Sequence, residues 1–149
     1  MIKVIMLLAN LVCLESGWDR ADGELVLQTI INRARQRGTS LEEEALRAGQ
    51  YAIGTCKVLK DHHIQLARSA VYGTLRGNEP WRARITHFAA KRVLSRKHRL
   101  CKQSTIKEVW EHAGYTELHR SKSGHVYFGK SRSNKGNGEP CPIKKNGGS

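Results

Sequence analysis

The residues of this chain best suited to chemistry are carboxylates near the amino terminus. Glu15 follows the apolar run of residues 1–14 and precedes a Ser-Gly-Trp-Asp turn, which places the indole of Trp18 nearby. Apolar surroundings raise the pKa of a carboxyl group and keep its proton available near neutral pH, as a general acid requires. The alternative is a solvated carboxylate at a helix end, without a catalytic role.

Three further carboxylates follow Glu15 along the chain, at Asp19, Asp22 and Glu24. Glycoside cleavage generally uses two carboxyl groups, so each of the three is a candidate for the second one. The alternative is a place in the first turn of a helix, where negative charge complements the helix dipole.

The apolar run of residues 1–14 has two interpretations. Lys3 followed by apolar residues is typical of a signal peptide. However, no Ala-x-Ala step follows, and cleavage after Ser16 or Gly17 would remove Glu15. We therefore expect a buried helix, with export by another route such as a phage lysis system or a dedicated secretion machine. The run is too short to cross a bilayer, so no transmembrane segment is expected.

Periodicity predicts an α+β chain in which helices predominate. Residues 23–37 repeat apolar side chains at helical spacing, with Asp22 as the expected cap and Gly38 after the end. Ser40 and Glu43 form the pattern of a capping box. The other expected elements are helices over 40–49, 61–75 (stopped by Gly77) and 104–112 (with Trp110 on its buried face), a short extended piece over 50–52, and strands over 85–90, 115–119 and 125–128.

The charge is strongly positive and unevenly spread over 149 residues, a length that suits one domain. Residues 1–60 hold 8 basic and 7 acidic side chains, a net charge of +1, and residues 61–149 hold 18 and 6, a net charge of +12. Such a surface favours polyanionic partners, namely nucleic acid, an anionic membrane face or a bacterial cell wall.

Four cysteines, Cys13, Cys56, Cys101 and Cys141, are separated by 43, 45 and 40 residues. No two of them are close enough to resemble a zinc site, so two long-range disulfides are the preferred interpretation and four free thiols the alternative. Residues 130–149 are poor in apolar side chains, so a flexible basic tail is expected there unless Cys141 ties it down.

Several segments, in order, resemble known families. Residues 14–19, Leu-Glu-Ser-Gly-Trp-Asp, are similar to the Glu-Ser-Gly-aromatic-Asn/Asp signature of lytic transglycosylases and goose-type lysozymes, whose Glu is the catalytic acid. The rest of the chain resembles cell wall hydrolases related to spore-cortex-lytic enzymes, although those have Glu-Ala-x-Gly-Glu at the first segment. The matching segments are Gly23 with residues 30–34 (Ile-Ile-Asn-Arg-Ala), 50–52 (Gln-Tyr-Ala), 67–73, 85–88 (Ile-Thr-His-Phe) and 124–128.

The resemblance implies a lysozyme-like domain over residues 1–129 that cleaves the β-1,4 bond between N-acetylmuramic acid and N-acetylglucosamine in peptidoglycan. Glu15 would protonate the leaving oxygen and then act as base. Attack by the 6-hydroxyl of the substrate would make it a lytic transglycosylase, and attack by water a muramidase. The expected substrate-binding residues are Trp18, Gln50, Tyr51, Thr86, His87 and His125, for each of which a structural role is the alternative.

The implied setting is the periplasm or cell wall, where the protein would act as a phage endolysin or a secreted antibacterial effector. Peptidoglycan glycan strands are the expected partner, together with an inhibitor or immunity protein if the chain is a toxin. No cofactor or metal is expected, because His62, His63, His87 and His98 lack the spacing of a metal site. The alternative function is a basic nucleic-acid-binding module without enzymatic activity, although no dense basic helix face or zinc knuckle supports nucleic acid as a partner.

Overall fold

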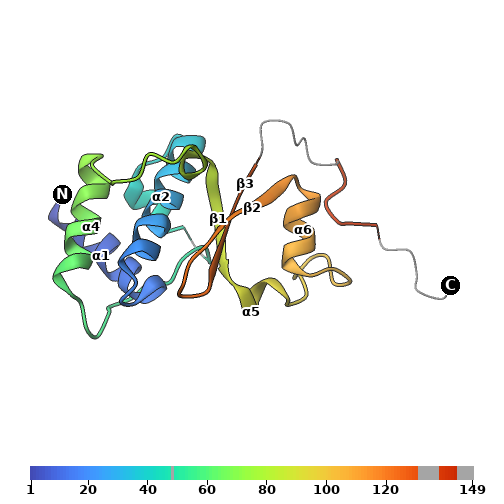
Figure 1. Cartoon of the computed structure of the whole chain (residues 1–149), viewed down its shortest axis with the longest axis horizontal. Helices are drawn as coiled ribbons and strands as arrows, with labels where there is room; N and C mark the ends of the chain where they lie inside the picture. Colours follow the sequence, from blue (N-terminus) through green and yellow to red (C-terminus); the bar gives the residue numbers. More distant parts are fainter. Residues whose placement is uncertain (48, 131–137, 144–149) are drawn as a thin grey trace.

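Two halves make up the molecule, with a small sheet at their boundary (Figure 1). The structure, a computed structural model, describes residues 1–47, 49–130 and 138–143. The coarse class expected from the sequence, α+β with helices predominating, is confirmed. The helical half contains α1 (Ile2–Ser16), α2 (Arg20–Arg37), α3 (Leu41–Ala45) and α4 (Asp61–Tyr72), and the sheet half contains the 3-10 helix η1 (Pro80–Arg84), β1 (Ile85–Ala90), α5 (Lys91–Leu94), α6 (Ile106–His112), β2 (Tyr115–Arg120) and β3 (His125–Lys130).

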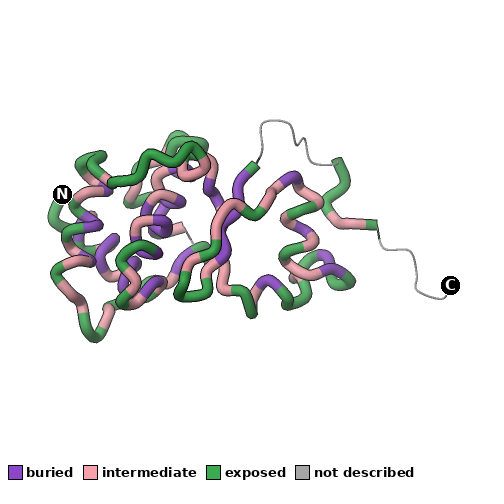
Figure 2. Tube along the Cα trace, in the orientation of Figure 1, coloured by how far each residue is buried: buried purple, intermediate pink, exposed green. Residues whose placement is uncertain are grey.

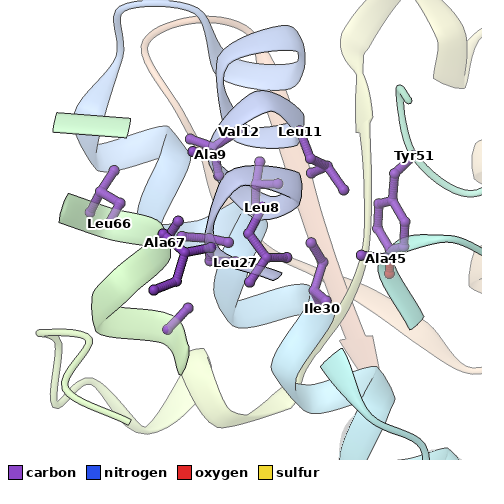
Figure 3. Packing of buried hydrophobic residues seen from close by; sticks show 13 residues of the cluster. Leu8, Ala9, Leu11, Val12, Leu27, Ile30, Ala45, Tyr51, Leu66 and Ala67 are labelled. Carbon is purple, nitrogen blue, oxygen red and sulfur yellow. The ribbon is translucent and has the colours of Figure 1, made fainter. Parts of the chain in front are cut away.

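The core of the helical half is built around α1. Leu8, Leu11 and Val12 of α1 are fully or almost fully buried and pack against apolar side chains of α2 and α4 (Figure 3). Burying a leucine side chain stabilises a fold by about 1.5–3 kcal/mol, so this helix contributes strongly to stability. The helix expected over residues 1–14 is thus present, and it is central to the core.

The sheet is antiparallel, in the order β1-β3-β2. Side chains of β3 alternate between its two faces: Tyr127 packs with Leu25 of α2, whereas Val126 and Phe128 pack with Leu94 of α5. Both faces of β3 are therefore covered, and the central strand is buried over most of its length (Figure 2). Its first residues consequently lie against α2 of the helical half.

Several helix ends differ from those predicted. Asp19, not Asp22, caps α2: its carboxylate accepts a hydrogen bond from the Asp22 backbone N–H (3.0 Å), so the helix begins earlier than expected. Helix α4 ends at Tyr72 rather than near Gly77, because Gly73 adopts the left-handed conformation that stops it (φ 69°). Thr105 rather than Ser104 caps α6. The short helices η1 and α5 were not expected.

The helix expected over residues 40–49 ends at Ala45, and a turn and a bend at residues 50–51 replace the expected extended piece. Other expected local features are present. Ser40 and Glu43 form the capping box of α3, and the three expected strands are found. Two disulfides join Cys13 to Cys56 and Cys101 to Cys141, one in each half. Most of the expected tail lies outside the described residues. Within the described ranges, no helix has the length and apolar character needed to cross a bilayer.

Candidate active site

Glu15 lies in the last turn of α1, where the backbone is held from several sides. Its Oε1 atom accepts a hydrogen bond from the backbone N–H of Ala52 (2.6 Å). Gly17 ends the helix with φ 58°, and its carbonyl oxygen accepts a hydrogen bond from His63 Nε2 of α4 (2.6 Å). Within the described part of the chain, Oε2 of Glu15 has no hydrogen bond. The half-buried carboxylate is thus fixed through one oxygen and open at the other.

The segment that supplies the Ala52 donor is itself anchored to α1. The Cys13–Cys56 disulfide joins it to the helix two residues before Glu15. The carboxamide oxygen of Asn10 also accepts a hydrogen bond from the Cys56 backbone N–H (2.8 Å). Contacts within α1 therefore fix the loop that positions the carboxylate.

Glu44 anchors the same segment from the other side. Its carboxylate is completely buried, accepts a hydrogen bond from the Tyr51 hydroxyl (3.0 Å), and pairs with Arg33 (3.1 Å) and Arg37 (2.8 Å). Burial raises the pKa of Glu44, but the hydrogen bonds from Arg37 and Tyr51 and the charge of Arg33 outweigh it and hold the pKa below its ordinary value. This charged cluster was not predicted, because residues 42–44 are all Glu and the sequence does not indicate which is buried.

Asp22 forms the second buried carboxylate of the site. It is fully buried in the first turn of α2, where Oδ2 accepts a hydrogen bond from His125 Nδ1 (2.6 Å) and Oδ1 accepts one from the Tyr127 hydroxyl (2.5 Å). Burial raises the pKa of Asp22, but the hydrogen bonds from His125 and Tyr127 outweigh it, so the pKa lies below its ordinary value. Tyr127 was not among the expected site residues.

Aromatic contacts link the loop beside Glu15 to His125, the partner of Asp22. The Phe88 ring meets the His125 ring edge-on, with centroids 5.3 Å apart, and lies 6.3 Å from the Tyr51 ring. Tyr51 directly precedes Ala52, the partner of Glu15. Contacts therefore run from Glu15 to the loop, across β1 to His125, and back through Asp22 to the turn that follows α1. The structure thus brings together Glu15, Asp19, Asp22, Tyr51 and His125, all expected from the sequence.

A second group of expected residues surrounds an adjoining cavity of about 230 Å³. Of the expected residues, Gln50, Tyr51 and His87 line it, together with Arg33 and Trp110, which were not expected at the site. Burial lowers the pKa of His87 to about 4, so its ring is neutral at pH 7. Thr86 lies beside it in the chain, itself buried, with its hydroxyl 3.0 Å from His87 Nδ1.

Two expected residues lie apart from this arrangement. The Trp18 ring, expected to shelter Glu15, is 70% exposed and has the Lys60 ammonium 4.5 Å from its centroid. Glu24 pairs with Arg82 of η1 (3.6 Å). Asp22 and Glu24 are two residues apart on a helix, so their side chains point about 200° apart.

Asn32 and Arg33 of α2 connect the two halves. The Asn32 carboxamide donates hydrogen bonds to the carbonyl oxygens of Arg82 and Ile85 (2.8 Å each), and Arg33 reaches the carbonyl oxygen of Thr86 (3.5 Å). Helix α2 is thereby joined to the start of β1. The sequence offered both residues only as part of a family motif, without this role.

The described residues contain no group of three or more His, Cys, Asp or Glu side chains arranged to hold a metal ion. Comparisons of the chain with protein-family models, with curated proteins and with solved structures find no match. The function must therefore be inferred from the site itself.

Proposed function

We propose that this protein cleaves the glycan strands of peptidoglycan, and that its helical half and sheet form a lysozyme-like domain. The observation that carries the proposal is the setting of Glu15. A backbone N–H fixes one carboxylate oxygen at 2.6 Å, the other oxygen accepts no hydrogen bond from the described residues, and the Glu15 charge acts on His125.

Glu15 serves in turn as general acid and general base in this proposal. The protonated carboxyl group donates its proton to the glycosidic oxygen as the bond from C1 to that oxygen breaks. The resulting carboxylate then accepts the proton of the attacking hydroxyl. Among the described residues, none of the three candidate carboxylates is left for direct attack: Asp19 caps α2, Asp22 is paired with His125 and Tyr127, and Glu24 is paired with Arg82. The attacking group is therefore the 6-hydroxyl of the substrate or a water molecule.

The charge and the disulfides fit this substrate and its location. A net charge of +13 favours adsorption to an anionic cell wall. The two disulfides are typical of proteins in an oxidising compartment, such as the periplasm or the outside of the cell. Both features suit an endolysin or an antibacterial effector, and an effector implies a dedicated inhibitor in the producing cell.

The proposal is tested by incubating purified protein with isolated peptidoglycan sacculi and following turbidity and the masses of released fragments. Glu15→Gln keeps an oxygen that can accept the Ala52 hydrogen bond but removes the transferable proton. We expect at least about a hundred-fold lower rate of fragment release. Glu42→Gln removes an exposed carboxylate on α3 and should leave the rate unchanged.

Either of two results would overturn the proposal. One is a Glu15→Gln protein that clears sacculi as fast as the wild type, and the other is a wild type that releases nothing. In the second case, salt-dependent binding to DNA and RNA would test the nucleic-acid-binding alternative. Anhydro or reducing ends on the fragments separate a lytic transglycosylase from a muramidase.

A further inference from the structure

The hydrogen bonds of Asp22 determine the orientation of a histidine at the edge of the site. His125 is the first residue of β3, and its side chain is 12% exposed, whereas Asp22 is completely buried beneath it. Nδ1 of His125 donates to Oδ2 of Asp22, while Oδ1 of Asp22 is occupied by the Tyr127 hydroxyl. Within the described part of the chain, Nε2 of His125 has no hydrogen bond. The ring is therefore fixed through one nitrogen, and the other is available to a ligand.

The charges around His125 are mostly negative. Asp22 faces it from α2, Asp19 from the cap of that helix and Glu15 from the end of α1. Two cations, Lys91 of α5 and Arg120 of β2, line the same shallow pocket of about 210 Å³ as His125. Burial lowers the pKa of His125, but the hydrogen bond to Asp22 and the three carboxylates outweigh it and raise the pKa above its ordinary value.

We propose that Asp22 is a positioning residue rather than a second catalytic carboxylate, and that it orients His125 through the hydrogen bond to Nδ1. In the protonated form of the ring, the Nε2–H group donates a hydrogen bond to an oxygen of the bound glycan beside Glu15. Hydroxyl and acetamido carbonyl oxygens of an N-acetylated sugar are the acceptors of matching chemistry. This inference rests on the proposed function and assigns the buried carboxylate a role within it.

The role predicts an alkaline limit to activity. The Nε2 proton is lost as pH rises through the folded-state pKa of His125, and substrate binding weakens with it. Asp22→Asn keeps the size of the side chain and removes the charge. It should therefore move the alkaline limb of the pH profile to lower pH by about one unit or more, and raise KM rather than lower kcat at neutral pH.

The test measures rates on soluble glycan strands across pH and, in parallel, the NMR titration of the histidine rings. Wild type, Asp22→Asn, Glu24→Gln and His125→Gln are compared. Glu24→Gln removes a carboxylate from the same helix that pairs with Arg82 instead, so it should change neither the limb nor the titration. His125→Gln keeps an N–H donor that cannot titrate, so the alkaline limb should disappear while activity at neutral pH is partly retained.

The outcomes separate this inference from the proposed function. A wild type that is inactive at every pH overturns the proposed function. An active wild type whose alkaline limb survives in His125→Gln, or does not move in Asp22→Asn, overturns the inference alone. If Asp22→Asn fails to fold, His125→Gln and the titration of the wild-type ring decide. A measured pKa of wild-type His125 at or below the ordinary value for histidine would contradict the proposal.

Discussion

Glu44 is a buried charge whose removal should be costly, because it is the shared partner of Arg33, Arg37 and Arg47. Its carboxylate is completely buried against Arg33, Arg37 and Tyr51. Glu44→Gln would leave the Arg33 guanidinium, which is 10% exposed, without its counter-ion. We expect a loss of about 3 kcal/mol in the free energy of unfolding, measured by urea denaturation. Glu42→Gln, on the exposed side of α3, should stay within about 0.5 kcal/mol of wild type, and equal midpoints for the two variants would contradict this account.

At the residue scale, the sequence pointed to several residues that the structure places near Glu15, but not to the residues that hold them in position. Glu15 stands out because a carboxyl group at the end of an apolar run is visible in the sequence alone. Glu44 and Tyr127 do not stand out, since what matters in each is a partner reached only after folding. Asp22 illustrates both cases. The sequence identified it as a candidate carboxylate, but its pairing with His125 was not predicted, because the two residues are 103 positions apart.

Among the elements, the loop that contains Ala52 depends on the Cys13–Cys56 disulfide, which closes a separation of 43 residues. Replacing both cysteines by serine should lower the free energy of unfolding by about 3–4 kcal/mol. It should also reduce fragment release from sacculi at a temperature where the variant is folded, because Ala52 is no longer held against Glu15. Thermal unfolding monitored by circular dichroism and the sacculus assay measure the two effects.

The matched control is the Cys101–Cys141 disulfide of the sheet half, which has a similar separation of 40 residues. Its double serine variant should lose comparable stability and keep more of the activity of the folded protein. Equal loss of activity in the two folded variants would show that the first disulfide has no particular role at the site.

The elements themselves were predicted where local rules decide them. The capping box at Ser40 and the expected strands follow from short patterns that tertiary packing did not override. The start of α2 was missed, because Asp19 and Asp22 are both good caps and the choice depends on how α1 ends. The end of α4 was missed because Gly73, the first glycine after the start of the helix, stops it before Gly77.

For the whole molecule, the buried charged groups predict a stability that falls on both sides of a weakly acidic optimum. Asp22 and Glu44 have folded-state pKa values below their ordinary values of 3.8 and 4.5, so the stabilisation they contribute is present above those values and is lost as pH falls through the folded-state values. His125 has a pKa raised above 6.5, so its contribution is complete below that pH and is lost as pH rises through the folded-state value.

His87, whose pKa burial lowers to about 4, adds a contribution that is complete above pH 6.5 and is lost as pH falls toward 4. The Tm measured from about pH 3 to about pH 9 should therefore be highest at about pH 6.5. Asp22→Asn should flatten the alkaline side, because His125 then loses the partner that raises its pKa. A wild-type Tm that climbs steadily through the alkaline range would contradict the assignment of His125.

The arrangement of the two halves could not be predicted from the sequence, and one consequence of it concerns cooperativity. Neither disulfide crosses the boundary, and α2 supplies the buried polar contacts made there by Asp22, Asn32 and Arg33. Each half also has apolar packing of its own. Helix α2 thus contributes strongly to whether the protein melts in one transition or two, together with the packing of Tyr51 on Phe88. Loss of these contacts would leave two cross-linked subdomains free to unfold separately.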